Sequence, residues 1–221
     1  MSLRIAVQMD PLETVNIDAD STFALMLEGQ RRGHSLVEYH PDALTYKNGA
    51  ITAAVRPVEA QREHGNHARF GQTRTIELRA ESDVVLMRQD PPFDMQYIAA
   101  THLLESIHGV GENQTFWVNH PGHVRNAPEK IFVTEFAEFM PPTMISRNVA
   151  DITAFRDEYR DIIVKPLFGN GGAGVFHLKP DDENLTSLLE TLLLSSREPL
   201  MIQGYLPAIR AGDKRIILVD G

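Results

Sequence analysis

The feature that most constrains this chain is a run of glycines held between two apolar stretches. Residues 161–167 read as a buried strand that ends in Lys165-Pro166, and glycines follow at positions 169, 171, 172 and 174. Residues 174–179 then alternate like a second strand and stop at Pro180. Clustered glycines let backbone N–H groups approach phosphate oxygens closely. The segment therefore predicts a strand–loop–strand hairpin that holds a phosphate group.

Other interpretations of the glycines fit the flanking sequence less well. A dinucleotide fingerprint requires a helix directly after the glycines, and a P-loop requires Gly-Lys-Ser/Thr. A protein kinase carries its lysine on the strand after the loop, whereas Lys165 precedes it. A glycine hairpin without a ligand is the plain structural alternative. Lys165 in an otherwise apolar strand argues against it, because a buried ammonium needs an anionic partner.

The N-terminal part opens with a strand–helix–strand pattern. A strand is predicted over residues 3–9, a helix from Asp20 or Ser21 to Gly33, and a strand over 36–39. This order implies a parallel, Rossmann-like sheet, so the fold class is α/β (α+β). Further along we expect a hairpin at 46–50, an exposed polar excursion over 59–71, strands over 83–88 and 115–119, and a helix from Asp94 to about 107.

A turn at residues 120–122 marks the expected end of the first domain. Beyond it, helices are predicted near 124–137 and over 150–160 and 184–196, and strands over 143–147, 200–206 and 214–219. The resulting division is an N-terminal Rossmann-like substrate domain over 1–122, a central lid subdomain over 123–199, and the start of a C-terminal subdomain over 200–221.

Composition excludes several classes of function. The net charge is −9 with no Lys/Arg run, which disfavours nucleic acid as a partner. The chain has no cysteine, so disulfides, thiolate zinc sites and cysteine nucleophiles are ruled out. No apolar run approaches the roughly 20 residues of a membrane span, and no secretory signal is present. These features favour a cytoplasmic protein without a membrane partner.

Several segments together resemble one family. A strand ending in Lys-Pro before a glycine loop is similar to the ATP-grasp ligases. Residues 7–11 (Val-Gln-Met-Asp-Pro), 86–94 (Leu-Met-Arg-Gln-Asp-Pro-Pro-Phe-Asp), and 203–209 (Gln-Gly-Tyr-Leu-Pro-Ala-Ile) with 212–215 resemble prokaryotic glutathione synthetases in particular. The resemblance runs along the whole chain in order. It implies an ATP-grasp fold and ligation of γ-glutamylcysteine to glycine through an acyl phosphate, with ATP as co-substrate and Mg²⁺ or Mn²⁺ as cofactor.

The resemblance also implies roles for individual residues. Lys165 and Arg215 correspond to catalytic positions, and Arg88, Asp90 and Asn119 to the pocket for the peptide substrate. Residues 169–174 resemble a flap over the phosphates, and 203–206 the segment whose backbone reads the adenine. The implied ATP-binding residues are Lys130, Lys165, Gly169, Asn170, Gly171, Gly172, Ala173, Gly174, Gln203, Gly204, Tyr205, Leu206 and Asp213.

The chain departs from the family pattern at a few positions and stops early. Gln89 stands where a lysine is common, and Phe168, Asn170 and Gly204 also differ. The resemblance places the metal ligands beyond residue 221, so none is expected within this chain and we expect weak or no ligation by the 221 residues alone. It further implies a homo-oligomer, a tetramer.

Three rival functions stay open on the sequence. The first is another ATP-grasp carboxylate–amine ligase, such as a D-alanine–D-alanine ligase, against which residues 88–94 argue. The second is a nucleotide-binding module without catalysis. The third is a dinucleotide oxidoreductase, which rests only on the literal G-x-G-x-x-G match.

Overall fold

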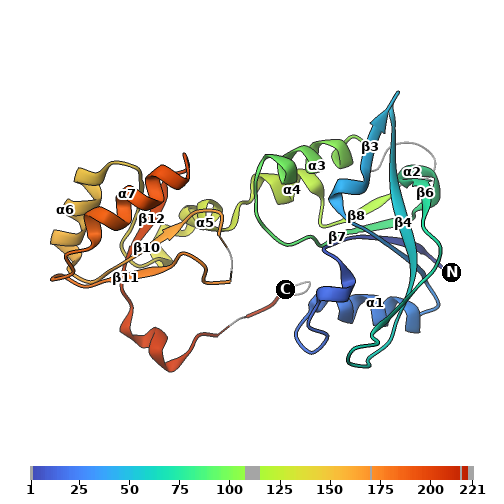
Figure 1. Ribbon diagram of the computed structural model, residues 1–221, viewed down its shortest axis with the longest axis horizontal. Helices are drawn as coiled ribbons and strands as arrows, with labels where there is room; N and C mark the ends of the chain where they lie inside the picture. Colours follow the sequence, from blue (N-terminus) through green and yellow to red (C-terminus); the bar gives the residue numbers. More distant parts are fainter. Residues whose placement is uncertain (1, 108–114, 170, 215, 219–221) are drawn as a thin grey trace. The chain divides into compact units, whose positions relative to one another are not determined.

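The N-terminal strand β1 (Arg4–Gln8) lies inside an eight-stranded sheet in the computed structural model, which describes residues 2–107, 115–169, 171–214 and 216–218. β1 pairs in parallel with β2 (Ser35–Tyr39) on one side and with β7 (Val84–Met87) on the other. β7 in turn pairs in parallel with β8 (Phe116–Val118). The predicted Rossmann-like parallel arrangement is confirmed (Figure 1).

Two helices cover opposite faces of this sheet. α1 (Ser21–Arg31) buries Phe23 and Met26 in one apolar cluster with β1 and β2, and α3 (Met95–Glu105) buries Leu104 in the other. Each helix begins at the predicted cap. The Asp20 carboxylate accepts a hydrogen bond from the N–H of Phe23, and the Asp94 carboxylate accepts one from the N–H of Tyr97.

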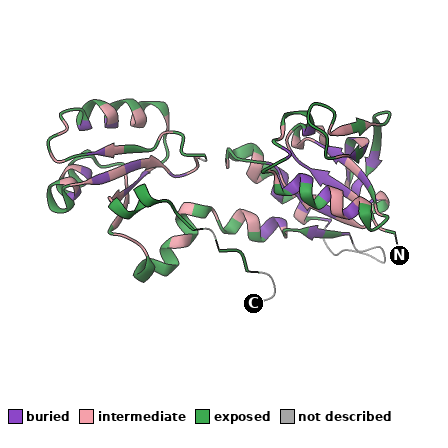
Figure 2. Cartoon of the chain, turned by 90° about the horizontal axis from the view of Figure 1, so that it is seen from below, coloured by how far each residue is buried: buried purple, intermediate pink, exposed green. Residues whose placement is uncertain are grey.

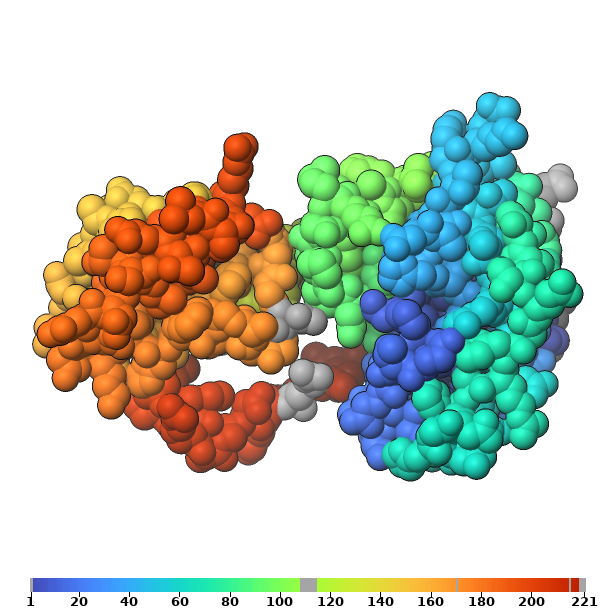
Figure 3. Space-filling model, in the orientation of Figure 1, coloured from blue at the N-terminus to red at the C-terminus, as the bar shows by residue number. Residues whose placement is uncertain are grey.

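An antiparallel extension joins the parallel strands through β4 (Ala50–Ala60). It pairs with β2, β3 (Leu44–Lys47), β5 (Ala68–Phe70) and β6 (Arg74–Glu77). The hairpin predicted at residues 46–50 is confirmed, with positive φ at Asn48 and Gly49. Its tip stands clear of the rest of the unit in Figure 3.

The expected exposed excursion over residues 59–71 is wrong in part. β4 continues to Ala60, which is buried, and β5 pairs with it from Ala68 to Phe70. Glu59 and Arg69 occupy exposed positions of these strands. These charged residues make the segment look polar throughout, so the alternation typical of a strand was not recognised. Short elements complete the unit: η1 (Leu12–Thr14), η2 (Pro41–Ala43), α2 (Leu78–Glu81) and α4 (Pro121–Asn126).

The single helix predicted near residues 124–137 is wrong. The chain instead forms α4, α5 (Glu129–Phe132) and η3 (Val133–Phe139). Pro128 explains the first break, because proline lacks an N–H and disfavours the α conformation in the preceding residue, and Ala127 has φ −121° and ψ 56°. The turn expected at 120–122 is in fact the start of α4, where the His120 ring accepts a hydrogen bond from the N–H of Gly122.

Residues 1–128 and 129–221 form two separate compact units. The second unit holds a four-stranded antiparallel sheet in the order β11 (Phe176–Leu178), β10 (Ile162–Pro166), β12 (Leu200–Gly204), β9 (Thr143–Ser146). α6 (Val149–Tyr159) and α7 (Leu185–Ser195) pack on one of its faces. Figure 2 shows the buried residues of each unit concentrated on its sheet.

The C-terminal segment differs from the prediction. η4 (Pro207–Ala211) follows β12. Within the described part of 214–219, which is Lys214 and residues 216–218, the backbone is not in a strand, because no described strand pairs with it. The three-domain division stays a prediction, although β12, assigned to a third domain, is hydrogen bonded between β10 and β9.

Candidate functional site

The site of the second unit is the face of its sheet that the helices leave uncovered. Side chains alternate along β10: Ile162 and Val164 are fully buried against α6 and α7, whereas Ile163 and Lys165 point to the other face. On this face lies a hollow of about 490 Å³. It is lined by Pro141, Ile163, Lys165, Val175, His177, Gln203, Gly204, Tyr205, Leu206, Ile209 and Arg210.

The glycine run forms the predicted loop between two antiparallel strands. β10 and β11 pair antiparallel on either side of it, and no helix begins after the glycines. Gly171, Gly172 and Gly174 have φ of 58°, 79° and 70°, a region that L-residues rarely adopt. A Cβ at Gly174 would also lie 3.0 Å from the ring of Pro166. The tight turn therefore requires glycine for conformation and, at one position, for space.

Two lysines from separate elements lie beside this loop. Lys130, on α5, donates a hydrogen bond from Nζ to the carbonyl oxygen of Gly169 over 2.5 Å. Lys165, on β10, is partly buried, and its side-chain ammonium forms no hydrogen bond or ion pair among the described residues. Burial lowers the pKa of Lys165, and the nearby Lys130 ammonium lowers it further, while Glu129 opposes the shift. The Lys165 side chain thus lines the hollow, and the Lys130 ammonium lies at the glycine loop beside it.

Hydrogen bonds to adjacent segments hold residues 203–206 in place. The Gln203 amide donates to the Thr143 hydroxyl, and the N–H groups of Gly204 and Tyr205 donate to the carbonyls of Pro142 and Asp161. Leu206 is 55% exposed at the rim.

The remaining predicted residues of this site lie at or beyond its edge. Gly169, Gly171, Gly172, Ala173 and Gly174 form the loop, and Asp213 is exposed beyond η4 and does not line the hollow. Asn170 and Arg215 lie outside the described residues.

Sequence reasoning missed six residues that line the hollow: Pro141, Ile163, Val175, His177, Ile209 and Arg210. A signal existed for three of them. Ile163 stands two residues before Lys165 on the same strand face, and Val175 stands two residues before His177 within the strand predicted over 174–179. Arg210 had no local signal, because η4 brings it to the hollow.

The candidate residues of the first unit follow the carboxyl ends of its parallel strands, where open α/β sheets bind ligands. Arg88 directly follows β7 and donates from Nε to the Thr22 hydroxyl and from Nη2 to the Ser21 hydroxyl, both in the first turn of α1. The N–H of Asp90 donates to the Asp10 carboxylate over 2.7 Å. Two neutral hydroxyl groups therefore orient the Arg88 guanidinium.

Beside Arg88, Asp90 is part of a small polar hollow of about 80 Å³ that also includes Asp10, Gln89 and Tyr97. Partial burial raises the pKa of Asp90, the Asp10 and Asp20 carboxylates raise it further, and Arg88 opposes them. Gln89 is buried, and its amide oxygen accepts a hydrogen bond from the buried Gln8 side chain. Asn119 follows β8 and is exposed, and it does not line this hollow.

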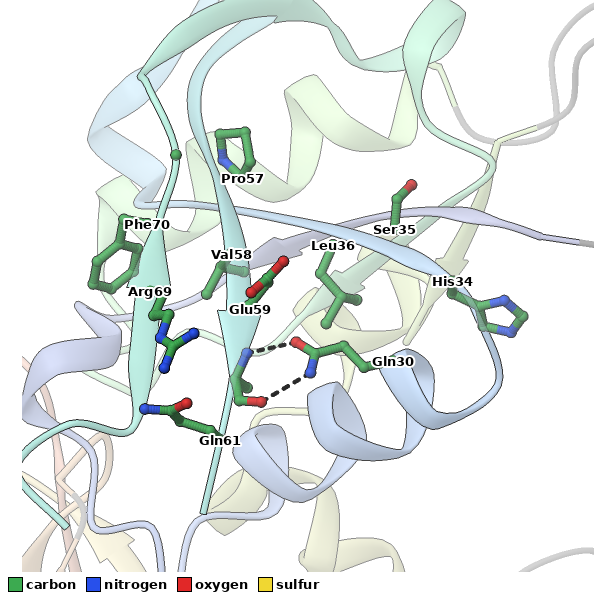
Figure 4. A pocket seen from close by; sticks show the side chains of 12 residues that line it. Gln30, His34, Ser35, Leu36, Pro57, Val58, Glu59, Gln61, Arg69 and Phe70 are labelled. Atoms are coloured by element: carbon green, nitrogen blue, oxygen red, sulfur yellow. Dashed lines mark hydrogen bonds between the residues drawn. The ribbon is translucent and has the colours of Figure 1, made fainter. Parts of the chain in front are cut away.

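A second, larger hollow in the first unit was not anticipated. It measures about 720 Å³ and opens where β2 and β4 diverge (Figure 4). The Gln30 side chain reaches from α1 and hydrogen bonds the backbone N–H and carbonyl of Ala60. Glu59 and Arg69, of opposite charge, lie on its border. Gln30 thus replaces the strand pairing that is lost where the sheet splits.

Among the described residues, no group of three or more histidine, aspartate or glutamate side chains is arranged to hold a metal ion. No helix in the described part of the chain combines the length and the apolar character needed to cross a bilayer.

The fold defines the class of protein. The chain superposes on an ATP-grasp RimK domain protein from Sphaerobacter thermophilus with a TM-score of 0.56, 17% identity, and coverage of 92% of this chain and 64% of that one. It superposes on the D-cycloserine synthetase DcsG with a TM-score of 0.57, 16% identity, and coverage of 93% and 60%. The fold is that of the ATP-grasp ligases, as predicted.

Sequence comparison narrows the class to one family. The model of the prokaryotic glutathione synthetase N-terminal domain matches residues 3–125, and that of its ATP-grasp domain matches residues 129–221. The glutathione synthetases of Mesorhizobium japonicum and Brucella melitensis are each 54% identical over 221 residues, all of this chain and 69% of each relative. The chain belongs to the prokaryotic glutathione synthetase family, whose members are ATP-dependent ligases. This excludes the oxidoreductase interpretation.

Proposed function

We propose that this chain provides the nucleotide site and part of the peptide site of a glutathione synthetase, which ligates γ-glutamylcysteine and glycine through an acyl phosphate. The main support for a nucleotide site is the pair of cationic side chains, Lys130 and Lys165, beside the glycine loop. Lys165 is partly buried without an anionic partner among the described residues, which is costly unless a ligand supplies the charge. A nucleotide triphosphate supplies it.

In this proposal the loop and the two lysines act on the phosphates. Phosphoryl transfer depends mainly on positioning and charge neutralisation. Loop N–H groups and Lys165 bind the phosphate oxygens, and Lys130 moves from the Gly169 carbonyl to the nucleotide. The apolar pair Ile163 and Val175 and the backbone of residues 203–206 enclose the base. Asp213, Asn170 and Arg215 keep their proposed nucleotide roles from family resemblance alone.

Arg88 is proposed to bind a carboxylate of the peptide. A guanidinium binds carboxylate with two parallel hydrogen bonds, and Arg88 is oriented by hydroxyls at the N-terminus of an 11-residue helix, which also favours anions. Asp90 and, on resemblance only, Asn119 complete this pocket and hold the polar groups of the peptide. The reaction that follows joins the activated cysteinyl carboxylate to the glycine amine and releases ADP and phosphate.

The finer features are proposed on resemblance. They are a divalent metal, Mg²⁺ or Mn²⁺, held by residues outside those described here, a homotetramer, and a cytoplasmic location.

Ligand binding to this chain tests the proposal directly. Calorimetric titration is expected to show saturable binding of ADP and of γ-glutamylcysteine, and none of D-alanine. Release of ADP in the presence of γ-glutamylcysteine and glycine, but not of D-alanine, would extend the result to turnover. Binding of D-alanine in place of the peptide would favour the D-alanine–D-alanine ligase alternative, and failure to bind any nucleotide would refute the site.

A further inference from the structure

We propose that His177 is a positioning residue for the nucleotide base, and that it acts by holding Tyr205 at the base end of the hollow in the second unit. This inference rests on the proposed nucleotide site. The sequence analysis gave His177 no role, and no role for it follows from the phosphate-binding loop.

Strand register places His177 at the end of the hollow away from the phosphates. On β10, Ile163 lies two residues, or about 6–7 Å, before Lys165 on the same face. His177 on β11 is directly opposite Ile163, and Gln203 on β12 is opposite it on the other side. These three residues form a row across the floor of the hollow. The row lies one step beyond Lys165 and its glycine loop, where a base would extend.

Two contacts fix the His177 ring within this row. Its Nε2–H donates to the Asp161 carboxylate over 3.0 Å, and its ring stacks on that of Tyr205 with centroids 4.0 Å apart and planes at 23°. The His177 side chain is only 23% exposed. An imidazole held on two sides in this way presents a fixed surface to the hollow.

Tyr205 is held by the same set of groups. Its N–H donates to the carbonyl of Asp161, so Asp161, His177 and Tyr205 close a ring of contacts. Its hydroxyl accepts a hydrogen bond from Nε of Arg210, which also lines the hollow. Loss of His177 would free the Tyr205 ring and loosen the adjoining backbone that faces the base. The phosphate end, made by Lys130, Lys165 and the loop, would not change.

This difference between the two ends supplies the test. Binding constants of ADP, GDP and tripolyphosphate are measured for the unsubstituted chain, His177→Ala and His177→Phe. We expect His177→Ala to weaken ADP binding roughly tenfold and to reduce the preference for ADP over GDP. Tripolyphosphate, which has no base, should bind within about twofold of the unsubstituted chain. His177→Phe keeps the stacked ring but loses the Asp161 hydrogen bond, and should give an intermediate loss.

A matched control is available on the other face of the same sheet. Tyr159→Ala removes a ring that packs on Phe155 at 4.5 Å on α6, away from the hollow, and should leave all three binding constants unchanged. Equal weakening of ADP and tripolyphosphate in His177→Ala, or no weakening of either, would overturn the inference while the nucleotide site stands. Failure of the unsubstituted chain to bind ADP would instead refute the proposed function.

Discussion

The two units treat charge in opposite ways. In the first unit the Arg56 guanidinium lies between the Glu38 and Glu13 carboxylates. In the second unit the Lys165 ammonium has no hydrogen bond or ion pair among the described residues, and the charged group that shifts its pKa most is another lysine. The first arrangement stabilises the free protein, and the second is stabilised only by an anionic ligand. A charge left without a partner is therefore the better indicator of a ligand site.

The largest expected effect comes from removing the unpaired charge. Lys165→Met should weaken nucleotide and tripolyphosphate binding roughly 100-fold, about 3 kcal/mol, because a charge-assisted contact is lost. The free protein should not be destabilised, since methionine removes the cost of a partly buried ammonium. Calorimetric titration and thermal unfolding measure the two effects.

The sign of the pH dependence follows from the lowered pKa of Lys165. The folded state binds this proton less tightly than the unfolded state, so the cost of Lys165 is present at neutral pH. The cost falls as pH rises through the lowered pKa toward the ordinary value of 10.5. The stability gained by Lys165→Met should shrink over the same range. A loss of stability in Lys165→Met at neutral pH would break the contrast between the units.

The second largest effect is expected when a paired charge is removed, and it should lower the free energy of unfolding. Burial raises the pKa of Glu38, whose side chain is 5% exposed, whereas Arg56 lowers the pKa of the more exposed Glu13. Arg56→Met leaves Glu38 buried and unpaired, and should cost about 2–3 kcal/mol. The fluorescence of Trp117, the single tryptophan, reports unfolding of the first unit.

A double variant and an exposed pair serve as controls for this measurement. Adding Glu38→Leu to Arg56→Met should restore most of the stability, because no buried charge remains. Arg74→Met breaks an exposed pair with Glu81 and should cost under about 1 kcal/mol. Equal losses in Arg56→Met and Arg74→Met would show that the buried pair is not special.

Glycine substitution should produce a smaller effect that is confined to the second unit. Gly174→Ala places a Cβ on a residue with φ 70° and brings it against the Pro166 ring. The native loop conformation should become less favourable by about 1–3 kcal/mol. Gly171 has φ 58°, and a Cβ added there would meet no neighbouring atom. Gly171→Ala should therefore show the cost of the left-handed backbone conformation alone, about 1 kcal/mol. ADP affinity should therefore fall more in Gly174→Ala, and the reverse order would contradict this geometry.

The smallest expected effect is on the acidic group of the first unit. The raised pKa of Asp90 means that the folded state binds its proton more tightly than the unfolded state, so ionisation of Asp90 costs stability as pH rises. Asp90→Asn should raise the thermal midpoint slightly at neutral pH, and the gain should vanish as pH falls below the ordinary value of 3.8. A gain that persists in acid would assign the effect to something other than charge.

Local sequence signals predicted much of the fold. Asp20 and Asp94 cap the predicted helices, and Asn48-Gly49 turns the predicted hairpin, because each depends on a few neighbouring residues. The pairing of β4 with β5 and β6 was not predictable, because it depends on partners distant in the chain. Pro128 did carry a local signal for a helix break, which the apolar pattern over residues 124–137 obscured.

The same distinction between local signals and distant partners applies to the residues of the candidate site. Lys165 and the glycine loop are contiguous in sequence, so their neighbourhood was predictable from residue order. His177 and Arg210 reach the hollow through strand register and through η4, and neither follows from residue type. Asn119 follows β8, the strand beside β7, and does not line the hollow that includes Asp90, so its place in the peptide pocket stays a prediction.

Hydrogen exchange of the backbone amides, measured with and without a non-hydrolysable ATP analogue, tests the central claim most directly. We predict that the analogue slows exchange in residues 165–175 and 203–206, and that Lys165→Met abolishes this protection. Protection confined to residues 1–128, or protection of 165–175 that survives Lys165→Met, would contradict the assignment of the nucleotide to the open face of the second sheet.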